Sequence, residues 1–307
     1  MSDIAAPRPN ASDPHPSVPR AHMADTRDPR RLVRFRLSSL TAALVSVVLL
    51  AFLSLTTVLG QGLDTLIMYS VQAQLPFHWT MSLVLNTLVS VPVLLGTAAV
   101  MLIVILWQRK FSLLWRIFAV LVSANATTQL LKLVLTRPEL GVGHSLPNSF
   151  PSGHVTLVAG IGMVLIAAAP PKWRGIASLV AWATTCFVGI AVMDLGWHRL
   201  SDVLGAILVT TIWAFVWLPS TRNLFHPSPR DHTFAAVAWG VLTAGIIGNG
   251  LVAWHLRGIL AYPIGGPALQ IMGEAGFPGR VVAVLAVAMV TTLVAIVVYG
   301  VTRLVEQ

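Results

Sequence analysis

Residues 37–60 read LSSLTAALVSVVLLAFLSLTTVLG and contain no charged side chain. A helix rises 1.5 Å per residue, so about 20 apolar residues cross the roughly 30 Å of hydrocarbon in a bilayer. Four arginines lie immediately before this stretch, within residues 30–36. Positive charge at the start of an apolar helix favours a cytoplasmic N-terminus. The stretch therefore predicts a membrane-spanning signal anchor that stays in the mature chain.

The composition of the whole chain supports a membrane protein. Only 10% of the 307 residues are charged, 56% are hydrophobic, and the mean hydropathy is +0.79. A soluble domain has about a quarter of its residues charged. The net charge of +9 does not indicate a nucleic-acid partner, because the basic residues form short clusters between apolar runs. The single cysteine, Cys186, excludes a disulfide framework and leaves the redox compartment open.

Apolar runs further along the chain predict more spans. The first six spans form a contiguous block, and the polar segment 219–232 separates it from two more. We therefore predict an all-α integral membrane protein with a six-helix transmembrane bundle and two extra C-terminal spans. Its parts are a disordered, basic cytoplasmic tail (1–36, with little apolar content), a six-span domain (37–218) and a two-span extension (219–307). The eight predicted spans are 37–60, 82–107, 113–135, 154–170, 175–196, 200–218, 233–256 and 281–303.

The distribution of Lys and Arg predicts the orientation. If the N-terminus and the C-terminus are cytoplasmic, fifteen of the twenty basic residues lie on the cytoplasmic side. Lys132, Arg137, Arg199, Arg257 and Arg280 are the five that lie outside.

Three polar segments interrupt the apolar pattern, and this orientation places all of them on the outer side. They read KLVLTRPE (132–139), NSFPSGH (148–154) and GWHRLSD (196–202). Ionisable groups at a membrane-embedded surface are costly, so their clustering indicates function. Each segment borders a span between the third and the sixth. We therefore expect them to meet at one end of one bundle.

The residue types in these segments suit a phosphate group. His198 and Asp202 are four residues apart, so a helical start places them on one face, where the carboxylate can orient the imidazole. Pro151–His154 forms a small-residue turn before a helix, whose free N–H groups attract anions. Lys132 and Arg137 add cationic donors for phosphate oxygens.

These segments resemble the phosphatidic acid phosphatase type 2 superfamily, whose motifs are Lys-x6-Arg-Pro, Pro-Ser-Gly-His and Ser-Arg-x5-His-x3-Asp. The second motif is intact, and so is the His-x3-Asp half of the third. The resemblance implies a metal-independent reaction without a cofactor. It assigns His198 as the nucleophile that becomes phosphohistidine, Asp202 as its orienting carboxylate, and His154 as the acid for the leaving alkoxide. Phosphoryl oxygens would bind to Lys132, Ser152 and the Gly153 amide.

Two positions depart from the family pattern. Glu139-Leu140 stands where the first motif has Arg-Pro, and Ala191-Val192 stands where the third has Ser-Arg. Arg137-Pro138 comes two residues early, and Arg199 follows His198 directly. We therefore expect Arg137 and Arg199 to replace the missing arginines as phosphate ligands, with Glu139 as a structural partner of an arginine.

The functional hypothesis is a phosphatase for a lipid phosphate or diphosphate at the outer face of a bacterial plasma membrane, active on cell-envelope lipids. Its partners would be a phospholipid or polyprenyl phosphate substrate and membrane lipids, and the sequence leaves the oligomeric state open. The alternative is a degenerate site that binds an anionic lipid or a protein without catalysis. A transporter is disfavoured, because the spans carry few charges and no paired broken helices in matching halves.

Overall fold

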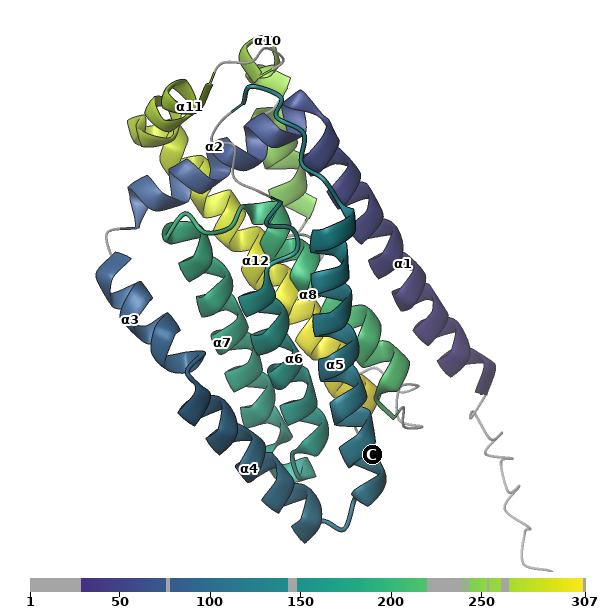
Figure 1. Ribbon diagram of the computed structural model, residues 1–307. Coiled ribbons are helices and arrows are strands. Elements are labelled where there is room, and N and C mark those ends of the chain that lie inside the picture. The colour runs from purple at the N-terminus through teal and green to yellow at the C-terminus, as the bar shows by residue number, and fades with distance from the viewer. Residues whose placement is uncertain are drawn as a thin grey trace, which may run out of the picture.

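The computed structural model describes residues 29–75, 78–142, 148–219, 240, 243–252, 254–260 and 265–305. Their regular structure is entirely helical (Figure 1), which confirms the predicted all-α membrane class. Residues 1–28 of the predicted tail lie outside these residues, whereas residues 29–36, which were predicted to be disordered, form the start of a helix. Part of the predicted span 233–256 also lies outside them, and the helix Thr243–Val252 within it is described.

Five helices among the described residues are long and apolar enough to cross a bilayer, as the sequence predicts for a multi-pass membrane protein. Their apolar parts contain few charged residues, because lipid cannot solvate them, and the four arginines of the first helix lie in its first eight residues. They are α1 (Pro29–Thr56), α5 (Phe111–Val134), α7 (Arg174–Asp194), α8 (Leu200–Trp217) and α12 (Gly276–Val305).

Two of the other predicted spans take a different form. Residues 82–107 fall into α3 (His78–Leu88) and α4 (Val91–Trp107), which meet at a 46° bend and can together form a sixth span. Pro92 stands at the first turn of α4, where its missing N–H is tolerated, and it prevents α3 from continuing. The fourth predicted span is α6 (Gly153–Ala168), which has only 16 residues and ends before Pro170.

The sequence pattern did not predict α2 (Val58–Gln74). The helix observed for the first predicted span, 37–60, ends at Thr56. Thr57 caps the next helix by accepting a hydrogen bond from the Gly60 N–H at 3.0 Å. Figure 1 shows α2 lying across one end of the bundle, beside α11 (Gly265–Glu274). The remaining short elements are α10 (Arg257–Leu260) and η1 (Pro171–Trp173).

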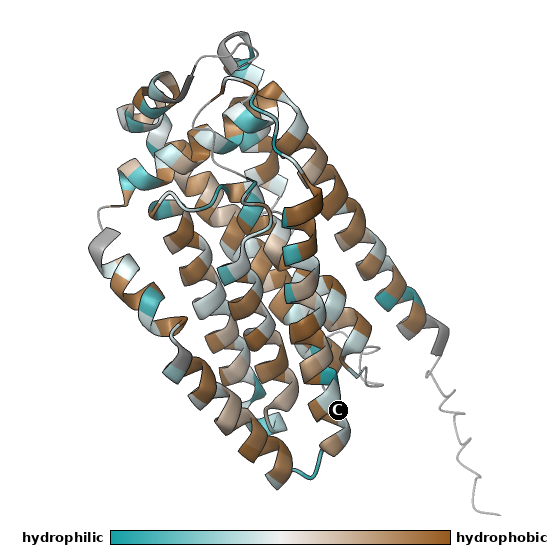
Figure 2. Ribbon diagram, in the orientation of Figure 1, coloured by the Kyte–Doolittle hydropathy of each residue, from teal (hydrophilic) through white to brown (hydrophobic). Residues whose placement is uncertain are grey.

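The core of the bundle forms where α5, α6, α7 and α8 pack together. The helices α6 and α7 approach each other closely, since a Cβ added to Gly162 would lie 2.9 Å from the Ala181 Cβ. Small residues at such contacts let membrane helices pack tightly. The helix α12 joins the same core with Val290 and Val301, so the C-terminal extension packs against the six-span block. Figure 2 shows hydrophobic outward faces on α1, α4 and α5, as expected for contact with lipid.

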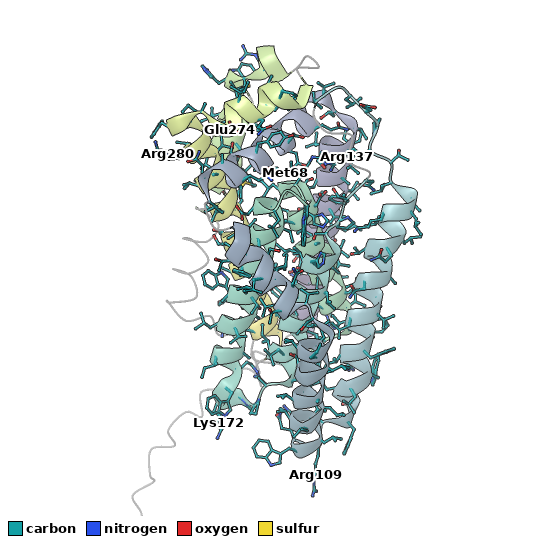
Figure 3. All side chains as sticks on the ribbon, turned by 60° about the vertical axis from the view of Figure 1, so that its left-hand side comes forward. Met68, Arg109, Arg137, Lys172, Glu274 and Arg280 are labelled. Carbon is teal, nitrogen blue, oxygen red and sulfur yellow. The ribbon has the colours of Figure 1, made fainter. Side chains whose placement is uncertain are left out.

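The two ends of the bundle differ in their charged residues. At one end, Arg36 and Arg116 donate hydrogen bonds to the carbonyl oxygens of Leu218 and Trp217 at the end of α8. Figure 3 shows Arg109 and Lys172 at this end, and Arg137, Glu274 and Arg280 at the opposite end. The predicted inner and outer polar segments therefore lie at opposite ends of the molecule, as the alternating spans require.

Candidate active site

The third polar segment forms the start of α8. Asp202 is the third residue of this helix and is fully buried. Its Oδ2 accepts hydrogen bonds from the Arg199 backbone N–H at 2.9 Å and from the Ser149 hydroxyl at 2.6 Å. A carboxylate in the first turn satisfies free N–H groups and faces the positive end of the helix dipole. The sequence therefore places a buried carboxylate here for the stability of α8 as well as for chemistry.

The same carboxylate orients His198. The His198 Nδ1 lies 3.4 Å from Asp202 Oδ2, a distance that allows an ion pair without the geometry of a hydrogen bond, and the residue is 8% exposed. The Trp197 and His198 N–H groups both donate to the Val192 carbonyl oxygen at 3.0 Å, which fixes the turn that carries the imidazole. With Nδ1 facing the carboxylate, Nε2 is the nitrogen left for a reaction.

The second polar segment is bonded directly to the third. The Ser152 N–H donates to the Asp202 carbonyl oxygen at 2.9 Å, and Ser152 Oγ caps α6 by accepting from the Val155 N–H at 3.5 Å. Ser152 is fully buried. The Ser152 hydroxyl accepts this bond through its oxygen and keeps its proton to donate, so its expected role as a phosphate ligand remains a prediction.

The N-terminus of α6 points its free amides toward a lysine. A Cβ added to Gly153 would lie 3.9 Å from the Lys132 Nζ, so the ammonium lies beside the first turn of α6. The N–H groups of a first helical turn have no partner within the helix. A cation and free amides together favour an oxyanion such as a phosphate. Lys132 and Gly153 thus lie where the sequence analysis expected them.

The two histidines of the site face each other across the ends of α6 and α8. The ring centroids of His154 and His198 are 6.4 Å apart, with an angle of 69° between the rings. The Trp197 ring lies 5.8 Å from that of His154 and flanks the same space. His154 is the second residue of α6, so its side chain belongs to the same helix start as the free amides.

Arg137 enters the site from the segment after α5, and its side chain is only 5% exposed. Its Nη2 donates to Asp202 Oδ1 at 3.3 Å and lies 3.8 Å from Asp64 Oδ2. Its Nε and Nη1 are buried and have no hydrogen-bond acceptor among the described residues. Buried guanidinium donors without an acceptor are costly, so they indicate a ligand that supplies oxygens.

Asp64 is a site residue that the sequence analysis missed. It lies on α2, is buried, and accepts from the Ser201 N–H at 2.9 Å and from the Ser201 hydroxyl at 2.5 Å. Burial and the nearby Asp202 carboxylate raise the pKa of Asp64, while Arg137 and Ser201 oppose that rise. One signal could have identified it: Asp64 is the only acidic residue between Asp28 and Glu139.

Arg199 contacts α2. It precedes α8, is 3% exposed, and its Nε donates to the Thr65 Oγ1 at 3.3 Å. Burial and the Arg137 charge lower the pKa of Arg199, while Asp64 and Asp202 oppose that effect. Its role as a phosphate ligand remains a prediction. Glu139, the expected partner of an arginine, is exposed, and no ion pair with it is found within the described residues.

The structure thus brings the three polar segments to one end of the bundle. In the described part of the chain, no group of three or more His, Cys, Asp or Glu side chains is arranged to hold a metal ion. The chemical roles of the predicted residues remain predictions. The eight residues are His198, His154, Asp202, Lys132, Arg137, Ser152, Gly153 and Arg199.

Comparison with known proteins identifies the segment that carries this site. The family model of the PAP2 superfamily matches residues 113–226, from the start of α5 to beyond α8. This match confirms the resemblance inferred from the motifs and contains all eight predicted site residues. No curated protein and no solved structure matches the chain significantly.

Proposed function

We propose that the protein is a lipid phosphate phosphatase, because residues 113–226 match the family model of the PAP2 superfamily, which implies phosphatase-type activity. Its substrate is a lipid phosphate or diphosphate at the extracytoplasmic face of the membrane. The reaction proceeds through a phosphohistidine on His198.

One observation supports this proposal more than any other. Arg137 is buried with two donors that lack an acceptor in the described part of the chain, beside His198 and Asp202. Lys132, the α6 N-terminus and His154 converge on the same region. A phosphoryl group placed there would supply the missing oxygens, and donors fixed before the reaction can stabilise its charge in the transition state.

The proposed reaction has two steps. In the first, His198 Nε2 attacks phosphorus while the bond to the lipid alkoxide breaks, and His154 gives its proton to the leaving oxygen. In the second, water attacks phosphorus, His154 takes a proton from that water, and the N–P bond breaks to release phosphate. Asp202 stabilises the imidazolium of His198 through Nδ1. Neither step changes an oxidation state.

The surface of the bundle suits a lipid substrate. Large apolar side chains are exposed along α1, α4 and α5, as expected for helices that face acyl chains. The site lies at one end of this bundle, so a lipid can approach laterally with its phosphate at the polar rim. The positive-inside rule, applied to the basic end that holds Arg36 and Arg116, supports an extracytoplasmic site. The same pattern suits a bacterial plasma membrane and cell-envelope lipids.

A direct assay tests the proposal. Purified protein in detergent is incubated with phosphatidic acid, phosphatidylglycerol phosphate and a polyprenyl diphosphate, and released phosphate is measured. At least one lipid should be hydrolysed, and His198→Ala should abolish the release. Phosphate release that is unchanged in His198→Ala would refute the histidine mechanism.

A second candidate is a binder without catalysis. It is favoured by the contacts of the two arginines, since Arg137 Nη2 pairs with Asp202 and Arg199 Nε contacts Thr65. Under this reading the site holds an anionic lipid but cannot transfer its phosphoryl group. The same assay separates the two, because a binder retains labelled lipid phosphate and releases none of it as free phosphate.

A further inference from the structure

The helix α2 connects two of the three polar segments of the candidate active site. Gln61 Nε2 donates to the carbonyl oxygen of Pro138, in the first polar segment, at 2.9 Å. Asp64 accepts from the Ser201 N–H, at the start of α8, also at 2.9 Å. The helix lies outside residues 113–226, which match the family. Part of the site is therefore assembled by a helix that the family match does not include.

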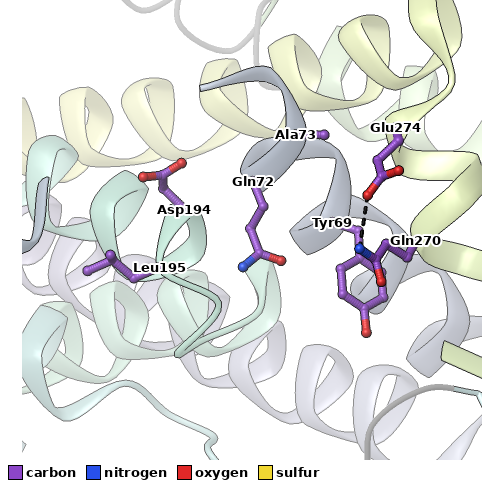
Figure 4. Close-up of a pocket in the computed structure, with 7 residues that line it drawn as sticks. All are labelled: Tyr69, Gln72, Ala73, Asp194, Leu195, Gln270 and Glu274. Atoms are coloured by element: carbon purple, nitrogen blue, oxygen red, sulfur yellow. Dashed lines mark hydrogen bonds between the residues drawn. The ribbon is translucent and has the colours of Figure 1, made fainter. Parts of the chain in front are cut away.

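Other contacts hold α2 in this place. A Cβ added to Gly196 would lie 2.5 Å from the Gln72 Nε2, so α2 packs on the turn that leads to α8. A Cβ added to Gly273 would lie 2.9 Å from the Ser70 backbone nitrogen, so α11 lies directly against α2. Figure 4 shows Gln72 between the end of α7 and α11. A residue on α2 can therefore keep a fixed position relative to the site.

The carboxylate of Asp64 is directed at Arg137. Asp64 Oδ2 lies 3.8 Å from the Arg137 Nη2, and Asp202 Oδ1 accepts a hydrogen bond from the same nitrogen at 3.3 Å. The Ser201 hydroxyl donates to Asp64 Oδ2 at 2.5 Å and restrains the carboxylate. One guanidinium nitrogen thus lies beside two carboxylates, while the buried Nε and Nη1 have no acceptor among the described residues.

Capping α8 does not require the charge of Asp64. The Ser201 N–H belongs to the first turn of α8 and needs an acceptor, but an amide oxygen would serve as well as a carboxylate oxygen. Burying a second carboxylate near Asp202 is unfavourable unless a cation offsets it. Arg137 is a cation that contacts both carboxylates. The charge of Asp64 therefore has a use beyond capping, which is to hold this guanidinium.

We propose that Asp64 is a positioning residue, which holds Arg137 so that Nε and Nη1 face a phosphoryl oxygen of the substrate. The inference rests on the proposed phosphatase function and adds α2 to the groups that serve the reaction. Asp64 does not touch the phosphate, because two negative charges repel each other. It keeps the guanidinium in one orientation, so the donors are ordered before the substrate binds.

A double-mutant cycle tests whether Asp64 acts through Arg137. The kcat/KM for hydrolysis of a radiolabelled lipid phosphate, with which slow variants stay measurable, is compared among the parent, Asp64→Asn, Arg137→Lys and the double variant. Asp64→Asn should lower kcat/KM about tenfold, which is typical of coupled neighbours in one charged network. In the Arg137→Lys background no fork of donors needs orienting, so the same substitution should change kcat/KM by less than about twofold.

Two more variants complete the test. Ser70→Ala is the matched control, since it removes a buried hydroxyl of α2 that donates to Leu66 of the same helix, and it should keep the parent kcat/KM. Thermal unfolding in detergent shows whether Asp64→Asn folds. If it does not, Ser201→Ala replaces it in the cycle, because it removes the hydroxyl bond to Asp64 and keeps the charge. That variant should also lower kcat/KM only where Arg137 is present.

The outcomes separate this inference from the proposed function. If the parent hydrolyses a lipid phosphate and Asp64→Asn keeps the parent kcat/KM, Asp64 does not position Arg137. Equal losses in the two backgrounds would refute the inference in the same way and leave the phosphatase function intact. If the parent releases phosphate from no lipid at all, the proposed function itself fails and this inference with it.

Discussion

Replacing Arg137 with Lys gives the sharpest test of how the phosphate is held. The Arg137 Nη2 already pairs with the carboxylates of Asp202 and Asp64, at 3.3 Å and 3.8 Å. Its Nε and Nη1 are buried donors without an acceptor among the described residues. A lysine ammonium keeps the positive charge between the two carboxylates but loses the planar fork of donors. The substitution therefore separates phosphate binding from the buried ion pair.

The expected loss follows from these contacts. Removing a fixed donor to a developing negative charge costs about 2–4 kcal/mol in the barrier. Since each 1.36 kcal/mol is tenfold in rate, kcat/KM should fall by roughly 30- to 1,000-fold. Arg137→Ala is a poorer choice, because it leaves Asp64 and Asp202 buried without their shared cation. Breaking a buried ion pair in that way costs about 3–5 kcal/mol of stability.

The assay combines lipid phosphate hydrolysis with thermal unfolding in detergent. Arg280→Lys is the matched control, since Arg280 is an exposed arginine at the same end of the bundle and its Nε donates to Gly276 of its own helix. The control should keep the parent kcat/KM. If Arg137→Lys unfolds at the parent temperature and also keeps the parent kcat/KM, Nε and Nη1 do not hold the phosphoryl group.

Three further predictions concern the metal, the orientation and Asp64. Hydrolysis should survive EDTA, because the mechanism assigns every step to protein groups; loss of activity that a divalent ion restores would contradict this. In a Cys186→Ser background, Glu139→Cys should react with a membrane-impermeant maleimide in intact cells and Lys172→Cys should not; the reverse labelling would invert the topology. Burial and Asp202 raise the pKa of Asp64 in the folded state, so its carboxyl favours folding at low pH and that contribution is lost as pH rises through the folded pKa. The unfolding temperature of Asp64→Asn relative to the parent should therefore rise between pH 4.5 and pH 8, and a falling difference would refute the assignment.

The sequence predicted the membrane class because hydropathy alone requires it. A run such as 37–60 has no soluble alternative, and five of the eight predicted spans are full-length apolar helices. The pattern could not show that the apolar run 37–60 is divided between α1 and α2 at Thr57. The apolar composition continues through Leu59, whereas the break depends on the Thr57 hydroxyl that caps α2. Hydropathy could not show the bend between α3 and α4 at Pro92 either, because both helices are apolar.

The relative positions of the predicted residues could be inferred from the sequence where they lie in local motifs, while their chemical roles remain predictions. His198 and Asp202 are four residues apart, and the Pro-Ser-Gly-His turn precedes a helix, so spacing alone places them. Asp64 carries no such local signal, because its partners Arg137 and Ser201 are distant in sequence. Its role depends on α2 crossing the end of the bundle, which is a tertiary arrangement. The exact contacts of Arg137 and Arg199 required the structure for the same reason.

Under the proposed function, the buried charges of the site offer a reason for the departures from the family motifs. Arg137 and Arg199 are balanced by Asp64 and Asp202, so these four groups carry no net charge when all are ionised. In the proposed site, a phosphate group with nearly two negative charges would then be offset by Lys132 and by the amides at the start of α6. Arg137 would contribute oriented donors as well as charge. The two carboxylates hold its Nη2, while Nε and Nη1 have no acceptor among the described residues. Arg137 lies two residues earlier than the arginine of the family motif. Asp64 on α2 therefore helps to fix the position of this arginine.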